Sequence, residues 1–150
     1  MIICPDDYMF TPEGEYLWTP ERAAKAWEEA NKAFREALLY KKFKRVVLIM
    51  GAPGSGKSTW LKKYKIEDVL YFDAVFKSWK TREPYLRLAW QAGYYPEVVW
   101  MRTPLEVCLE RNSQRPPNRK VPEDHLRGKW ESIRNFPPNP GREGFLLIVQ

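Results

Sequence analysis

The sequence has few of the residues that build metal centres and disulfide frameworks. It contains two cysteines, Cys4 and Cys108, and one histidine, His125. These residues form no C-x-x-C motif and no His/Cys ligand cluster, so we expect neither a metal site of that kind nor a disulfide. No apolar run approaches the length of a membrane span. The apolar start, Met1–Cys4, is too short for a signal peptide because Pro5-Asp6-Asp7 follow it. We therefore expect a cytoplasmic protein without membrane contact.

Length and charge narrow the class further. The chain has 150 residues, which is the size of one domain, and we expect a single domain over 1–150 with no room for a second catalytic module. The net charge of +6 is unevenly placed, since residues 41–65 contain eight basic residues and no acidic one, whereas residues 1–40 are net acidic. Such a segment favours a polyanionic partner, or equally forms the solvated face around a nucleotide site.

Short apolar runs alternate with helical patterns, which predicts an α/β fold with a five-stranded parallel sheet flanked by helices. The expected strands are Met1–Cys4, Val46–Met50, Val69–Phe72, Glu97–Met101 and Phe145–Val149. The expected helices begin at Thr19-Pro20-Glu21 and cover Lys57–Lys65, Tyr85–Ala92, Pro104–Gln114 and Pro122–Arg134. In the first helix, Trp27, Ala30, Phe34 and Leu38 recur at helical spacing and predict a core face.

Residues 51–58 read Gly-Ala-Pro-Gly-Ser-Gly-Lys-Ser, a complete G-x-x-x-x-G-K-[ST] phosphate-binding loop that follows an apolar strand and opens a helix. Its glycines let backbone N–H groups turn towards phosphates, and the helix N-terminus adds a positive dipole end. Lys57 would reach the β- and γ-phosphates and Ser58 would hold Mg²⁺. Strand, loop and helix occur in the required order, so this segment predicts binding of ATP with Mg²⁺ and disfavours a plain glycine-rich turn.

Three further features suit phosphoryl transfer, which needs a base for the acceptor proton, an acidic group near Mg²⁺ and cations for the moving charge. Asp6 follows the first strand, at the carboxyl edge where open α/β sheets place their ligands. Asp73 closes an apolar strand. Arg111 and Arg115 open a basic, proline-rich loop over residues 115–121 that cannot be helical, and arginine binds phosphate oxygens bidentately. Each of these residues also has a purely structural interpretation. An aspartate after a strand is often a helix cap, and surface arginines are usually solvated.

Taken together, these segments resemble the bacteriophage-type 5′-hydroxyl polynucleotide kinases. Gly51–Trp60 resembles the phosphate loop of that family, Arg111–Arg115 followed by Val121-Pro122 is similar to its lid, and Cys4–Tyr8 resembles the strand and loop with its catalytic aspartate. The resemblance implies that Asp6 is the general base and that Lys57 and Arg115 are catalytic. It further implies a metal contact through Ser58 and a role at the substrate or at a metal-bound water for Asp73. Lys77 and Arg82 are further candidate substrate contacts. The nucleotide contacts that it implies are Gly51, Ala52, Pro53, Gly54, Ser55, Gly56, Lys57, Ser58, Thr59, Arg111 and Arg115.

Two departures from the family pattern stand out. The Asp-Asp-Tyr strand and its helix precede the phosphate loop here, whereas in the family they follow it, so the segment order looks permuted. Adjacency in a sheet is set by packing and not by chain order. We therefore expect the first strand beside the Asp73 strand, then the phosphate-loop strand, Glu97–Met101 and the terminal strand. Met9 stands where the family often has an arginine, and Lys77 or Arg82 would compensate.

The leading hypothesis is an ATP-dependent kinase of 5′-hydroxyl ends of nucleic acids. A groove with Lys77, Lys80 and Arg82, and with Trp79 or a tyrosine for stacking, would hold the acceptor. These residues are compatible with RNA or DNA as the acceptor, with single-stranded or double-stranded ends, and with ATP or GTP as the donor. They are also compatible with any oligomeric state. A phosphate-loop kinase of a sugar, nucleoside or antibiotic is the second hypothesis, and a nucleotide-gated switch without an acceptor is the third. No Asp-x-Asp-x-Thr phosphatase motif occurs.

Overall fold

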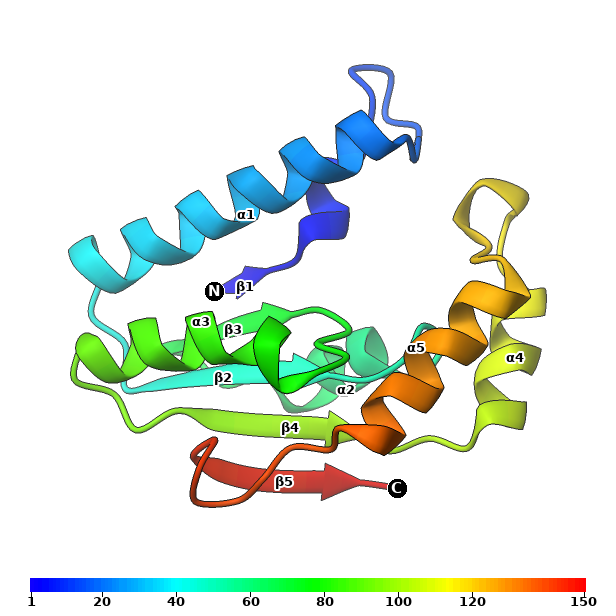
Figure 1. Ribbon diagram of the computed structural model, residues 1–150. Coiled ribbons are helices and arrows are strands. Elements are labelled where there is room, and N and C mark those ends of the chain that lie inside the picture. Colours follow the sequence, from blue (N-terminus) through cyan, green and yellow to red (C-terminus); the bar gives the residue numbers. More distant parts are fainter.

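A computed structural model describes residues 1–150 as one all-parallel sheet of five strands in the order β1-β3-β2-β4-β5 (Figure 1). The strands are β1 (Ile2–Ile3), β2 (Arg45–Met50), β3 (Val69–Asp73), β4 (Glu97–Met101) and β5 (Phe145–Val149). The predicted fold class is confirmed. The strand order is also the one expected for the permuted chain, with the first strand beside β3.

Five α-helices connect and cover these strands: α1 (Pro20–Tyr40), α2 (Lys57–Tyr64), α3 (Trp79–Gln91), α4 (Leu105–Ser113) and α5 (Glu123–Asn135). Two short 3₁₀ helices lie at Pro5–Tyr8 and Pro117–Arg119. The second of these corrects the prediction that the loop over 115–121 is free of helix. Helix α3 begins earlier than the predicted Tyr85, because Ser78 and Thr81 form a capping box and Pro84 is tolerated inside the helix. No helix is long and apolar enough to cross a membrane.

Helix α1 begins as its sequence predicts. The Thr19 hydroxyl accepts a hydrogen bond from the Arg22 N–H at 3.1 Å, and Pro20 occupies the first helical position. The buried face consists of Ala26, Ala30, Phe34 and Ala37. Trp27 was predicted to belong to this core face, but the residue is 39% exposed, because it lies at the border of the face.

The sheet has a packed layer on each face. Helices α1 and α3 cover one face (Figure 1). The aromatic rings of Phe34, Phe72 and Tyr85 meet there, with the Phe72 and Tyr85 centroids 4.6 Å apart. Helix α2 covers the other face through Leu61. Because side chains alternate along a strand, Leu48 of β2 joins the first layer and Ile49 joins the second. The two layers fix the carboxyl edge of the sheet, where the site lies.

An ion pair holds the connector between α5 and β5 against α3. Arg82 is fully buried, and its Nε donates to Glu143 Oε2 at 2.6 Å. Three of its four remaining guanidinium N–H groups donate to Glu143 Oε1 and to the carbonyls of Phe76 and Phe136. The prediction that Arg82 contacts substrate is therefore wrong: its donors are engaged inside the protein, where no substrate reaches them.

We predict that Arg82→Met lowers the free energy of unfolding by about 3–5 kcal/mol, because Glu143 is left buried without its counter-charge. Urea unfolding followed by circular dichroism measures the loss. The matched control is Arg87→Met on the same helix, whose ion pair with Glu83 is half exposed and should contribute less than about 1 kcal/mol. Equal stability of the two variants would contradict a structural role for Arg82.

Candidate active site

The phosphate loop connects β2 to α2 in a conformation that depends on glycine. Gly54 and Gly56 have φ values of 79° and 97°, which side chains other than glycine rarely adopt. A Cβ atom on Gly54 would also lie 2.7 Å from the Cys108 carbonyl oxygen. The N–H groups of Gly54 and Gly56 donate to no acceptor in the protein. They are therefore available to an anion at the N-terminus of α2.

Neighbouring elements hold this loop in place. The Thr103 hydroxyl after β4 donates to the Ser55 carbonyl at 2.7 Å, and the Trp130 indole N–H of α5 donates to the Thr103 carbonyl at 2.9 Å. Lys57 Nζ donates to the Gly51 carbonyl at 3.0 Å. Gly51 is buried, so this hydrogen bond holds the Lys57 ammonium group on the inner side of the loop. The loop is thus pre-formed, which lowers the cost of binding a nucleotide.

A cavity of about 680 Å³ opens over the loop. Most of the predicted nucleotide contacts line it, namely Gly54, Ser55, Gly56, Lys57, Ser58, Thr59, Arg111 and Arg115. The other three, Gly51, Ala52 and Pro53, are buried and do not line it. Arg111 has a second function, since its Nη1 donates to the Gly54 carbonyl at 3.1 Å. The structure therefore brings both arginines to the phosphate loop from α4 and the turn that follows it.

The two candidate aspartates meet at the carboxyl edge of the sheet. Asp6 follows β1 and Asp73 ends β3, and β3 lies between β1 and the phosphate-loop strand. Asp6 is exposed and accepts a hydrogen bond from the Tyr16 hydroxyl at 3.3 Å. Asp73 is buried, and its Oδ1 has no hydrogen-bond partner. The Asp6 carboxylate is therefore accessible to the hydroxyl group of an acceptor substrate. The Asp73 carboxylate is buried, and one of its oxygens makes no hydrogen bond.

Asp73 and Ser58 fit a role at Mg²⁺. The Ser58 side chain faces the nucleotide cavity, and the unpartnered Asp73 oxygen suits a metal-bound water. The chain has no group of three or more His, Cys, Asp or Glu side chains that could hold a metal by themselves. Mg²⁺ usually takes one or two protein ligands and completes its shell with water and phosphate oxygens. This site therefore suits Mg²⁺ that arrives with a nucleotide.

One part of the chain matches a known protein family. Residues 65–136 match a family model described as an AAA domain. That family consists of phosphate-loop NTPases and includes kinases like polynucleotide kinase. No curated protein matches the chain.

The fold is that of a phosphate-loop NTPase. The chain accordingly has a phosphate-loop kinase or NTPase activity. The matched residues include β3, the arginine-bearing helix α4 and α5, but neither the phosphate loop nor Asp6.

In this NTPase, burial raises the pKa of Asp73 above its ordinary value, the Lys57 ammonium lowers it, and Asp6 and Asp7 raise it. A carboxyl group whose pKa is raised in the folded state does not lower the free energy of unfolding at pH values below its ordinary pKa. It destabilises the fold as the pH rises through the folded-state pKa. At neutral pH the buried Asp73 side chain therefore costs the protein stability, as is common for residues of functional sites.

We predict that Asp73→Asn raises the melting temperature of the apo protein at pH 7 by about 2–4 °C, the shift that about 1 kcal/mol produces in a chain of this size. The gain should vanish near pH 3, where aspartate is protonated in both states. Thermal unfolding at both pH values measures it. The same variant should lose most of its nucleotide turnover. A destabilised Asp73→Asn at pH 7 would contradict this account.

Lys129 of α5 is a site residue that the sequence did not reveal. Burial lowers its pKa, the Asp6 carboxylate raises it, and the Lys77 and Lys57 ammonium groups lower it, so Lys129 lies within electrostatic reach of both sides of the site. No motif marked this lysine, because it sits in an amphipathic helix among other charged residues. Lys77 is exposed after β3, and its contact with substrate stays a prediction.

The basic loop of the NTPase, residues 115–121, is fastened to the segment that follows Asp6. The Arg119 guanidinium carbon lies 4.1 Å from the centroid of the Tyr16 ring, and Asn118 Nδ2 donates to the Tyr16 carbonyl at 3.1 Å. Tyr16 is the same residue that donates to Asp6. The loop that carries Arg115 is thus linked through one tyrosine to the candidate base.

We predict that Arg119→Ala loosens this loop, since a cation–π contact contributes about 0.5–2 kcal/mol. Amide hydrogen exchange over residues 115–121 should accelerate, and the KM for ATP should rise several-fold because Arg115 is less well placed. Arg127→Ala, which removes an exposed pair with Glu123 on α5, is the control. Unchanged exchange in Arg119→Ala would show that the loop is held by its proline residues instead.

Proposed function

We propose that this protein is an ATP-dependent kinase that transfers the γ-phosphoryl group to the 5′-hydroxyl end of a polynucleotide. The observation that supports the proposal most strongly is the juxtaposition of Asp6, Asp73 and the phosphate loop on three neighbouring strands, despite the transposed segment order. This placement restores the arrangement that the resemblance to 5′-hydroxyl polynucleotide kinases implies.

Asp6 is the general base of the proposed reaction. The residue is exposed and has only one hydrogen-bond partner, so an acceptor hydroxyl can reach its carboxylate. Asp6 takes the proton as the acceptor oxygen bonds to the γ-phosphorus. The bond from that phosphorus to the β–γ bridging oxygen then breaks, and the products are a 5′-phosphate end and ADP.

The phosphate loop and its cations stabilise the charge of this transfer. The N–H groups of Gly54 and Gly56 bind phosphate oxygens, and Lys57 leaves the Gly51 carbonyl for the β- and γ-phosphates. Arg115 approaches the same cavity from the loop over residues 115–121. Mg²⁺, when bound through Ser58 and through water at Asp73, neutralises phosphate charge.

A phosphate-loop kinase of a small hydroxylated molecule is the second candidate, because the same base and loop would serve it equally. An accessible carboxylate at Asp6 favours either kinase over a nucleotide-gated switch, which needs no base for an acceptor. Between the two kinases, the resemblance and the basic residues Lys77, Lys80 and Lys129 favour a polyanionic acceptor.

The test is transfer of label from γ-labelled ATP to a panel of 5′-hydroxyl oligonucleotides of DNA and RNA, nucleosides and sugars. A 5′-phosphorylated oligonucleotide serves as the blocked control. We predict labelling of the 5′-hydroxyl oligonucleotides, and a loss of about a hundredfold or more in turnover for Asp6→Asn, with nucleotide affinity little changed. Asp7→Asn, the neighbouring exposed carboxylate, is the matched control.

Several outcomes separate the candidates. Efficient labelling of a sugar or nucleoside without labelling of any oligonucleotide would replace the proposal with the small-molecule kinase. Full activity of Asp6→Asn together with an inactive Asp73→Asn would make Asp73 the base. ATP hydrolysis without labelling of any acceptor would favour the nucleotide-gated switch.

A further inference from the structure

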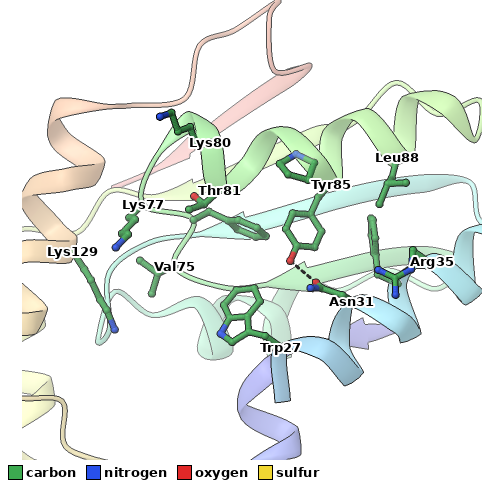
Figure 2. Close-up of a pocket in the computed structure, with 13 residues that line it drawn as sticks. Trp27, Asn31, Arg35, Val75, Lys77, Lys80, Thr81, Tyr85, Leu88 and Lys129 are labelled. Carbon is green, nitrogen blue, oxygen red and sulfur yellow. Dashed lines mark hydrogen bonds between the residues drawn. The ribbon is translucent and has the colours of Figure 1, made fainter. Parts of the chain in front are cut away.

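A second cavity, of about 590 Å³, lies between α1 and α3 (Figure 2). None of its lining residues lines the nucleotide cavity. Helix α1 contributes Trp27, Asn31 and Arg35, and α3 contributes Lys80 and Tyr85. The volume is within the range of small-molecule sites and is large enough for one nucleotide.

The middle of this cavity is aromatic. Trp27 stacks on Phe72 of the core, with centroids 6.1 Å apart and planes 28° apart, yet stays 39% exposed. Figure 2 shows Tyr85 facing it from α3, with the Tyr85 hydroxyl bonded to Asn31 Oδ1. The Asn31 amide NH₂ donates to no protein acceptor. A flat ring could therefore stack on the indole and accept a hydrogen bond from Asn31.

The ends of the cavity are cationic. In Figure 2, Lys77 and Lys129 lie at one end of the row of side chains and Arg35 lies at the other, with Trp27 and Tyr85 between them. Lys80 also lines the cavity, and no lining residue is acidic. The end with Val75 and Lys77 is the reactive end, because both residues closely follow Asp73 at the end of β3, and the Val75 carbonyl accepts a hydrogen bond from the Gly51 N–H of the phosphate loop at 3.3 Å. Lys129 lies at the same end in Figure 2, and burial lowers its pKa. An anionic ligand there would also favour the charged form of this partly buried lysine.

We propose that this cavity holds the 5′-terminal nucleoside of the acceptor strand, with its base on Trp27 and the following phosphate at the cationic end formed by Lys77 and Lys129. The proposal rests on the function proposed above and names its acceptor subsite. It replaces the groove predicted from the sequence, because Arg82 is buried in an ion pair and the Arg142 guanidinium carbon lies 4.1 Å from the Trp79 ring centroid.

The composition of the cavity selects among acceptor classes. A cationic antibiotic would be repelled by four basic residues that have no acidic counterpart in the lining. A plain sugar would carry neither a ring system for Trp27 nor a phosphate for Lys77. A nucleotide supplies both, since every base has a π-face and each phosphate contact releases a counterion.

The experiment measures binding and transfer separately. Anisotropy of a 3′-fluorescein-labelled, 5′-hydroxyl single-stranded oligonucleotide reports affinity, and γ-labelled ATP reports kcat and KM. Trp27→Ala should weaken binding about tenfold and raise the acceptor KM, while the KM for ATP stays unchanged. Trp27→Phe, which keeps a stacking face, should recover most of the affinity. Lys77→Ala should reduce the slope of log Kd against log salt by about one.

Two controls lie on the same helices but outside the cavity. Trp90→Ala removes an indole of α3 that is 60% exposed, and Lys32→Ala removes an exposed lysine of α1. Both should bind and phosphorylate oligonucleotides like the wild type. Circular dichroism and melting temperature identify any variant that fails to fold, and Trp27→Phe then carries the comparison.

The outcomes distinguish this inference from the function on which it rests. If the wild type phosphorylates oligonucleotides and Trp27→Ala, Lys77→Ala and the controls all behave alike, the cavity is not the acceptor subsite and the proposed function stands. If the wild type labels no oligonucleotide, the proposed function fails. Oligonucleotide binding that is still lost in Trp27→Ala would then retain the cavity as a nucleic-acid site.

Discussion

Strand β3 is paired on both sides, and the site depends on that pairing. It aligns Phe72 with Leu48 of the phosphate-loop strand and with Ile3 of β1. Because all three strands are parallel, their carboxyl ends lie at one edge, and the groups that follow them meet there. If β3 were paired with other strands, Asp6 and Asp73 would lie apart from Lys57, although the sequence would contain the same residues.

The same pairing explains how a transposed segment can leave the chemistry intact. Strand β1 is only two residues long, yet Ile3 is buried and Cys4, Pro5 and Asp6 follow directly. Helix α1 then covers β3 from the same side and brings Trp27 to the cavity between α1 and α3. Moving this strand and helix to the start of the chain changes connections on the surface but not the contacts in the sheet.

The molecule separates its two binding regions through buried polar contacts. On the donor side, Thr103, Trp130 and Arg111 hold the phosphate loop from behind. On the acceptor side, the buried Arg82–Glu143 pair holds α3 and the connector into β5. Tyr16 joins the two regions, since it contacts both Asp6 and the loop that carries Arg115. Binding of a nucleotide and the position of the base are thus physically linked.

Local sequence alone determined the strands, most helix boundaries and the phosphate loop, because apolar periodicity, the Thr19-Pro20 cap and the glycine spacing act over a few residues. It also indicated Asp6, Asp73, Arg111 and Arg115 as site residues. Only the tertiary structure decided which charged side chains are buried in ion pairs and which are exposed. Arg82 and Lys77 look alike in the sequence, but Glu143, sixty-one positions later, buries the first and leaves the second exposed. Likewise, Trp27 and Lys129 reach the cavity between α1 and α3 from distant helices, and such long-range packing leaves no local pattern.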